Sequence, residues 1–289
     1  MLPSRTAGLV SALTEHPPTL KAEKVASTHT VADDAIVICL GLRTPVTKAK
    51  KGGFKGLKAD NLLAAVLKEL LRKVPSVPME DIGDLVVGNV LQPGGGQAMV
   101  RVAMLEAGLP YTIPVASINR QCSSGLQAVA TVASHVKCGD YVLGIAGGVE
   151  SMSTCSFEGA RPIVDIGAVK ANPVAAACLI PMGITSENIA ERYEISRQEQ
   201  DRHSLKSHKR AAAARSNGAF SAEIVPIGKV EHDEGIRRDT TLQALAALKP
   251  AFAKQGTTTA GNSSQLSDGA AAVIGMFCYL GCPTLLLLD

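Results

Sequence analysis

IPVASINRQCSSGLQAVATVASHVKCGDYVLGIAGG, residues Ile113–Gly148, decides the fold class of this chain. The stretch opens with the short apolar run IPVASI and closes with YVLGIAGG, and each of these predicts a strand. Between them, GLQAVATVASHVKCG predicts an amphipathic helix that ends at Gly139. A strand, a helix and a strand in this order are typical of a βαβ unit, and hence of a mostly parallel sheet covered by helices.

The same alternation continues on both sides of this stretch. Residues 35–40 form a continuous apolar run, typical of a strand buried on both faces, and residues 84–90 and 268–274 predict further strands. Helices are predicted within residues 60–73, where Asp60 can act as the cap, and within residues 97–108. The first of these helices carries an apolar stripe formed by Leu63, Val66, Leu67, Leu70 and Leu71. We therefore predict an α/β fold with a mixed, mostly parallel sheet.

The composition divides the chain into an arm, a core domain, an insert and a tail. Residues 1–33 are polar and lack clear periodicity, which is typical of a leader or a disordered arm. Residues 34–158 together with 246–275 carry the sheet pattern of the core domain. Residues 159–245 predict an inserted, α-rich loop domain with helices at 186–193 and 196–216, and residues 276–289 form an atypical tail.

The end of the chain is free of charge from Ala270 to Leu288, a length that could span a membrane. Pro283 and two glycines interrupt this stretch, however, and its first part predicts a buried strand. We therefore expect no membrane span.

The composition also bears on partners and metals. The formal net charge is +3, aromatic residues make up 3% of the chain, and no long run of like charge occurs, so nucleic acid is not an expected partner. The seven cysteines are scattered without a CxxC pair, which favours reduced thiols over a disulfide framework. No spacing of His and Cys matches a zinc site, and we expect no metal.

Cys122 is the candidate nucleophile. It falls at the junction between a predicted strand and a predicted helix, where free backbone N–H groups and the helix dipole would stabilise a thiolate. Polar residues precede it and small residues follow it, which fits an exposed turn better than a core position. An ordinary buried cysteine remains the alternative, because cysteine is among the most buried residue types.

Four stretches resemble one family. INRQCSSGLQAVA (118–130) resembles the nucleophile motif of thiolases. VVGNVLQPG (86–94), CLIPMGITSENIAERY (178–193) and LKPAFAKQGTTTAGNSSQLSDGAAA (248–272) are similar, in family order, to 3-ketoacyl-CoA thiolases of the peroxisomal type. The resemblance runs from about residue 34 to about residue 273 and implies a thiolase N-terminal domain. By this resemblance the chain is an acetyl-CoA C-acyltransferase of fatty-acid β-oxidation that cleaves 3-ketoacyl-CoA through an acyl-thioester on Cys122.

The resemblance also implies binding residues for coenzyme A, which is a substrate here rather than a permanently bound cofactor. Ser264 matches the position whose hydroxyl holds pantetheine, although a turn serine is the plain alternative. Arg237 matches a position near the nucleotide phosphates, and a surface arginine is the alternative. Met182 lies in the segment that covers the acyl pocket, and Pro181 before it favours longer 3-ketoacyl chains than a histidine there would.

The chain departs from the family in its proton-transfer groups. The Gly-His-Pro, Cys-x-Gly-Gly-Gly and Asn-Glu-Ala-Phe motifs, which supply the base, the acid and part of the oxyanion site, do not occur in the sequence. All of them belong to a second thiolase domain, so we expect that domain to be missing and the 289-residue chain as written to be inactive. The alternative function is that of a truncated isoform that binds or regulates full-length thiolase. A related ketoacyl-condensing enzyme fits the GNSSQ loop less well.

Partners and location follow from the same resemblance. We expect acyl-CoA and CoA as ligands and a homodimer as the assembly. The peroxisome is the expected location, with the mitochondrion as the alternative because no acidic residue precedes Glu15.

Overall fold

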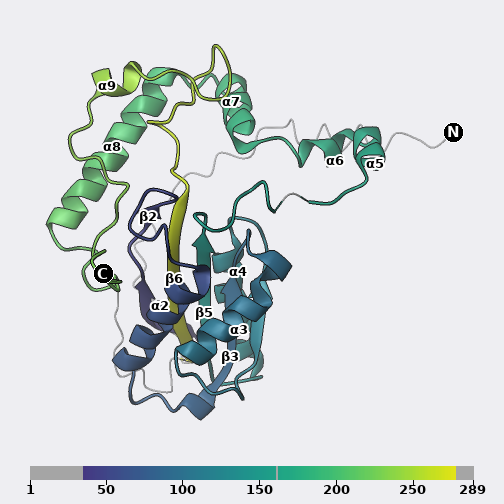
Figure 1. Ribbon diagram of the computed structural model, residues 1–289, viewed down its shortest axis with the longest axis vertical. Coiled ribbons are helices and arrows are strands. Elements are labelled where there is room, and N and C mark those ends of the chain that lie inside the picture. The colour runs from purple at the N-terminus through teal and green to yellow at the C-terminus, as the bar shows by residue number, and fades with distance from the viewer. Residues whose placement is uncertain (1–34, 161, 278–289) are drawn as a thin grey trace. The chain divides into compact units, whose positions relative to one another are not determined.

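The computed structural model describes residues 35–160 and 162–277, and a six-stranded sheet with the order β1-β6-β5-β3-β4 is its main feature (Figure 1). The strands are β1 (Ile36–Arg43), β2 (Thr47–Lys48), β3 (Ile82–Gly88), β4 (Val115–Ile118), β5 (Leu143–Ser151) and β6 (Ser267–Phe277). β3 pairs in parallel with β4 and β5, whereas β6 runs antiparallel to β1, β2 and β5. The predicted α/β class with a mixed sheet is confirmed.

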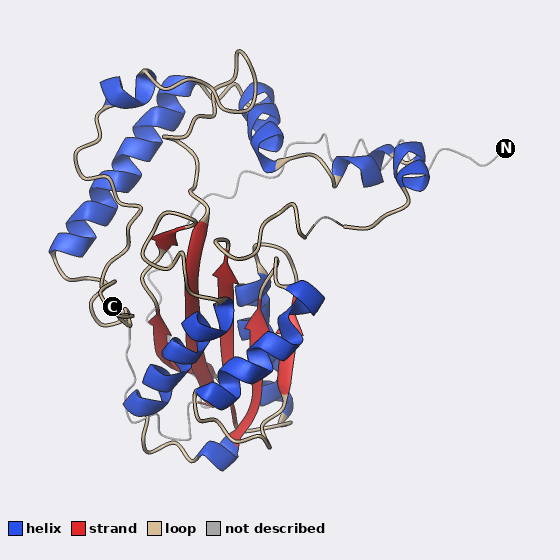
Figure 2. Ribbon diagram, in the orientation of Figure 1, coloured by secondary structure: helices blue, strands red, loops and turns tan. Residues whose placement is uncertain are grey.

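Helices cover both faces of this sheet (Figure 2). α2 (Ala59–Lys73) and α3 (Gln97–Glu106) pack against the face that carries Leu85 and Val87 of β3. α4 (Ser124–Cys138) packs against the opposite face, next to Val86. Successive residues of a strand point to opposite faces, so the continuous apolar run of β3 supplies both cores.

The apolar stripe of α2 is buried as predicted, but the predicted cap is wrong. Leu63, Val66, Leu67 and Leu70 are 0% exposed, and Leu71 is half-buried. The helix begins at Ala59 with Lys58 as its N-cap, and the side chain of Asn61 accepts a hydrogen bond from the Lys58 amide. Asp60 lies in the first turn instead, where its charge favours the positive end of the helix dipole.

β1 is not buried on both faces, which corrects the prediction from its apolar run. It stands at the end of the sheet and pairs with β6 alone among the described strands. Cys39 and Leu42 point into the core on the α2 side, whereas Ile38 points the other way and is 53% exposed. An apolar run therefore did not distinguish an edge strand from a central one.

The segment predicted as an insert is helical. It contains α5 (Ile166–Ala171), α6 (Pro173–Ala177), α7 (Met182–Arg192) and α8 (Arg197–Ser216), and α9 (Leu242–Ala246) follows at its end. α8 agrees with the prediction and has Ser196 as its N-cap, whereas α7 begins at Met182 rather than at Ser186. One-turn 3-10 helices lie at Met79–Asp81 and Pro93–Gly96.

The chain ends are only partly described. The predicted arm (1–33) and residues 278–289 of the predicted tail lie outside the described residues. The boundary predicted at residue 275 falls inside β6, which continues to Phe277. Among the described helices, none is both long and apolar enough to cross a membrane.

Candidate active site

Cys122 lies in a tight turn between β4 and α4. Gln121, the residue before it, has a φ of 51°, a conformation that non-glycine residues rarely adopt. Side chains of the turn fix it: the Asn119 Oδ1 accepts from the Gln121 amide at 3.0 Å, and the Ser124 Oγ accepts from the Arg120 amide at 2.9 Å. The result is an exposed thiol next to the first turn of α4, whose N–H groups have no carbonyl partner within the helix.

A glycine at the end of β3 brings this turn close to the sheet. A Cβ on Gly88 would lie 2.4 Å from the backbone carbon of Ser124 and 2.6 Å from the Gly125 amide nitrogen. Any side chain at position 88 would therefore push the start of α4, and Cys122 with it, away from β3. The predicted junction of strand, cysteine and helix is present, and its geometry depends on this contact.

Cys122 lines a cavity of about 900 Å³ at the carboxyl ends of β3 and β5. Met182 and Pro181 line the same cavity, as do residues 88–91 and 267–271, so all four stretches singled out in the sequence meet there. Small residues form part of the wall: Gly88, Gly125, Gly148, Gly269, Ala270 and Ala271. The remaining wall residues are Arg43, Thr44, Val46, Asn89, Val90, Leu91, Gln121, Ser124, Val149, Glu150, Met152, Phe157, Ile180, Ser267 and Asp268. The walls are mainly apolar with a few polar groups, as in sites for small organic ligands.

Polar residues at the ends of the parallel strands shape this cavity, and the sequence reasoning missed them. Glu150, at the end of β5, accepts hydrogen bonds from the Val90 and Leu91 amides at 2.8 and 3.2 Å. Asn89, which follows β3, is 2% exposed and donates to the Ser117 Oγ at 2.7 Å. The positions of both residues at the ends of predicted strands could have indicated them, because ligand sites of α/β sheets lie at the carboxyl ends of the strands.

Arg43, a residue of the cavity wall, forms ion pairs with the insert. Its guanidinium contacts the Asp233 Oδ1 at 2.7 Å and the Glu223 Oε1 at 2.7 Å. Partial burial alone raises the pKa of Asp233, but hydrogen bonds from Arg43 and from the Val46 amide outweigh that effect, so its pKa lies below the ordinary value. Asp233 is therefore held as a carboxylate against the end of β1.

The structure does not bring all predicted site residues together. Ser264 and Arg237 do not line the cavity that holds Cys122 and Met182. Ser264 is exposed and its hydroxyl donates to the Gln265 carbonyl at 3.1 Å, while the Arg237 amide donates to the His208 Nδ1 at 3.2 Å. Their roles toward coenzyme A remain predictions.

The described wall of the cavity contains the predicted nucleophile, Cys122, but neither of the proton-transfer residue types expected beside it. No histidine lines it, and of the described cysteines only Cys122 does. Within residues 35–160 and 162–277, no three His, Cys, Asp or Glu side chains are grouped as metal ligands would be.

A family model described as the thiolase N-terminal domain matches residues 36–277, and the chain belongs to the thiolase family. The match reaches four residues beyond the limit of about residue 273 expected from the motifs, and it includes the whole of β6.

The relatives are more specific than the family. The chain is 52% identical over 252 residues to the peroxisomal 3-ketoacyl-CoA thiolase B of Rattus norvegicus and 49% identical to the peroxisomal 3-ketoacyl-CoA thiolase of Homo sapiens, covering 83% of this chain and 59% of each relative. The crystal structure of the dimeric peroxisomal thiolase of Saccharomyces cerevisiae superimposes with a TM-score of 0.81 at 38% identity, covering 86% of this chain and 66% of that one.

These relatives confirm the resemblance to thiolases of the peroxisomal type. Their names also support the expected peroxisomal location. The chain spans about 59% of the length of these curated relatives, and the part it matches is the N-terminal domain.

Proposed function

We propose that this chain provides the acyl-carrying half of a 3-ketoacyl-CoA thiolase. The observation that carries the proposal is the position of Cys122: an exposed thiol after a residue with positive φ, at the start of α4, in the wall of a cavity of about 900 Å³. A thiol presented in this way is suited to covalent catalysis. The family and its relatives support the reaction class.

The reaction has two halves, and in each of them one bond to the acyl carbon forms and one breaks, apart from the proton transfers. The Cys122 thiolate attacks the 3-keto carbonyl of the acyl-CoA, the bond between C2 and C3 breaks, and its electron pair remains on C2 as the enolate of acetyl-CoA. Protonation of C2 releases acetyl-CoA and leaves an acyl-thioester on Cys122. The thiolate of a second coenzyme A then takes the acyl group and restores the free Cys122, so coenzyme A is a substrate throughout.

The described residues account for some of these steps. Cys122 precedes the first turn of α4, where the Ser124 and Gln127 amides already donate to the Gln121 and Ser123 carbonyls. The positive end of the helix dipole there favours negative charge on Cys122. The apolar wall around Met182, Ile180 and Phe157 offers space for an acyl chain. A base for the thiol and an acid for C2 are not supplied by a histidine or a second cysteine of the described wall, and the family resemblance assigns them to a second domain.

The test is acetyl-CoA release from a 3-ketoacyl-CoA of medium chain length by the purified 289-residue chain. We expect a slow burst of at most one acetyl-CoA per chain, because Cys122 can be acylated once while water, in place of a histidine or second cysteine of the described wall, takes the thiol proton and protonates C2 slowly. Cys122→Ser should abolish the burst, and Cys138→Ser, which replaces an exposed cysteine at the far end of α4, should leave it intact. Release that survives Cys122→Ser would refute the proposal, and so would the absence of any release.

A dimer is the proposed assembly. β4 is at the end of the sheet and pairs with β3 alone among the described strands, so one edge of β4 is available to another strand. The similar thiolase of Saccharomyces cerevisiae is dimeric, which supports the same state here. Sedimentation equilibrium of the purified chain should give twice the monomer mass, and a monomer at all concentrations would contradict it.

The alternative role, binding to full-length thiolase, would use the same edge of β4, which no described strand pairs with. Co-expression with a tagged full-length relative tests it, since mixed dimers would carry both chains.

A further inference from the structure

The turn formed by residues 257–262 is held between two helices of the insert. On the α8 side, Asn262 Nδ2 donates to the Asp201 Oδ1 at 3.1 Å and Ser204 Oγ donates to the Gly261 carbonyl at 2.6 Å. On the α7 side, the carboxylate of Glu187 accepts from the turn directly. The turn itself is closed by the Thr259 amide, which donates to the Asn262 Oδ1 at 2.7 Å.

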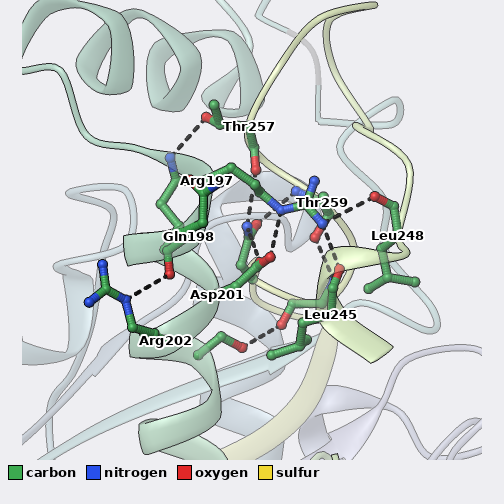
Figure 3. A network of polar contacts seen from close by, with 12 residues as sticks. Arg197, Gln198, Asp201, Arg202, Leu245, Leu248, Thr257 and Thr259 are labelled. Carbon is green, nitrogen blue, oxygen red and sulfur yellow. Dashed lines mark hydrogen bonds and ion pairs between the residues drawn. The ribbon is translucent and has the colours of Figure 1, made fainter. Parts of the chain in front are cut away.

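The α8 side of this arrangement is a buried ion-pair network (Figure 3). Asp201 is 3% exposed and pairs with Arg197 at 2.8 Å. The same guanidinium donates to the carbonyls of Leu245 and Leu248 at 2.6 and 3.1 Å. The network fixes one end of the turn without help from α7, so the turn keeps its attachment to α8 when the α7 contacts are removed.

Glu187 is the central contact on the α7 side. One carboxylate oxygen accepts from the Thr257 amide at 2.8 Å and from the Thr257 Oγ1 at 3.0 Å, and the other accepts from the Thr258 amide at 2.9 Å. Burial by itself raises the pKa of Glu187, but these hydrogen bonds outweigh it and the pKa lies below its ordinary value. Hydrogen bonds to an ionised carboxylate are stronger than those between neutral groups.

The helix that carries Glu187 also lines the cavity. α7 begins at Met182, which shares the cavity wall with Cys122. The turn that Glu187 holds leads, two residues after Asn262, to Ser264, and then into the start of β6, which lines the same cavity. One carboxylate therefore connects the helix of the acyl pocket with the segment predicted to bind pantetheine.

We propose that Glu187 is a positioning residue for coenzyme A, which fixes the 257–264 segment relative to α7 so that Ser264 meets pantetheine while the acyl chain lies beside Met182. The proposal rests on the proposed function, because it takes Ser264 as the pantetheine contact. Glu187 acts through the turn and does not itself touch the reacting atoms. Its loss should weaken the binding of coenzyme A without changing the reactivity of Cys122.

The test compares coenzyme A binding by the full chain and its Glu187→Gln variant in isothermal titration calorimetry. We expect the Kd to rise about tenfold, because a neutral amide replaces a carboxylate that accepts several hydrogen bonds. Glu191→Gln is the matched control: it removes the same charge from an exposed position on the same helix and should leave the Kd unchanged. Ser264→Ala should raise the Kd as well.

A second readout separates positioning from a general loss of structure. The rate of Cys122 alkylation by iodoacetamide should be equal in Glu187→Gln and the unchanged chain, since the turn that holds Cys122 has its own hydrogen bonds. If Glu187→Gln fails to fold, hydrogen exchange of the unchanged chain decides instead: coenzyme A should slow exchange at the Thr257 and Thr258 amides. Unaltered exchange at both would overturn the proposal.

The outcomes distinguish this inference from the function on which it rests. No binding of coenzyme A by the unchanged chain would refute the proposed function. Binding by the unchanged chain with an equal Kd in Glu187→Gln would leave the function standing and overturn the role of Glu187. An equal rise in Kd for Glu191→Gln would show a charge effect of the whole helix and overturn it as well.

Discussion

The sheet and the insert of this domain are held together by different forces. In the sheet, the residues that fix β3 and β5 are apolar and inaccessible: Leu85, Val86, Val87 and Ile145 are all 0% exposed. In the insert, few apolar side chains are buried; the carboxylates of Asp201 and Glu187 hold the helices, and that of Asp233 holds a loop against Arg43. The first region is stabilised by area removed from water, and the second by paired charges and hydrogen bonds.

The difference implies that the two regions have different roles. Apolar packing is close and has low compressibility, so the sheet provides a fixed position for Cys122. Hydrogen-bonded segments with exposed backbone open at lower cost than packed cores, so the insert can adjust to a ligand. Mutations should therefore lower global stability more when they fall in the sheet than when they fall in the insert, where ligand binding should be the more sensitive property.

The largest expected effect on the free energy of unfolding is that of Leu85→Ala in the sheet. Its side chain is 0% exposed and lies in the core between β3 and the helices α2 and α3. Deleting it should lower the free energy of unfolding by about 2–5 kcal/mol, because a cavity remains where the side chain packed. Urea denaturation followed by circular dichroism measures this, and a loss below about 1 kcal/mol would show that the sheet is less tightly packed than its burial indicates.

Gly88→Ala should have the next largest effect on stability, and it should also change the reactivity of Cys122. The added methyl group would meet the Ser124 backbone at 2.4 Å, so the start of α4 must shift. We expect a destabilisation of about 1–3 kcal/mol from overpacking, together with a changed alkylation rate at Cys122. An unchanged rate, measured with iodoacetamide on the folded variant, would contradict the dependence of the Cys122 turn on this glycine.

Asp233→Asn tests the insert and should depend on pH. Because the pKa of Asp233 is lower in the folded chain than its ordinary value of 3.8, the carboxylate stabilises the fold at higher pH. At pH 7 the free energy of unfolding of the unchanged chain should exceed that of the variant by about 1 kcal/mol, a modest amount because partial exposure screens the ion pair. This advantage should be fully present above about pH 4 and should be lost as the pH falls through the folded pKa. Urea denaturation of both chains at several pH values measures it, and an advantage that does not decline as the pH falls below about 4 would contradict the assignment.

The smallest effect is expected for Leu126→Ala on α4. Leu126 is an apolar residue of the same helix that covers the sheet, but it is 73% exposed. Its truncation should change the free energy of unfolding by no more than about 0.5 kcal/mol, as for other surface positions. A much larger loss would show that this face of α4 is covered by a partner in solution, which a measurement at several protein concentrations would reveal.

The same contrast explains which parts could be predicted from the sequence. The period of apolar residues located β3, β5, α2 and α4, since burial against a core imposes that period directly. It did not distinguish the edge position of β1 from a central one, because its run of apolar residues looks the same in both. The insert was predicted as helical, but Glu187 and Asn262 reach partners that no local pattern reveals.

The site was predictable to a similar extent. The polar and small residues around Cys122 indicated a strand-to-helix turn, and the structure has Cys122 in such a turn. Met182 shares its cavity as the family resemblance implied, although no pattern in the residues themselves indicated it. Glu150 and Asn89 were missed, because a single polar residue after an apolar strand is common and becomes informative only when the strand order is known.

The most direct test of the account is site-resolved mass spectrometry of the purified chain after incubation with acetyl-CoA. Transfer of the acetyl group from the sulfur of coenzyme A to a cysteine needs a nucleophile and a binding site, and the exposed Cys138 and Cys178 serve as internal controls. We predict acetylation at Cys122 with little at either control. Equal labelling of all exposed cysteines, or none at Cys122, would contradict the claim that this domain presents Cys122 as an acyl carrier.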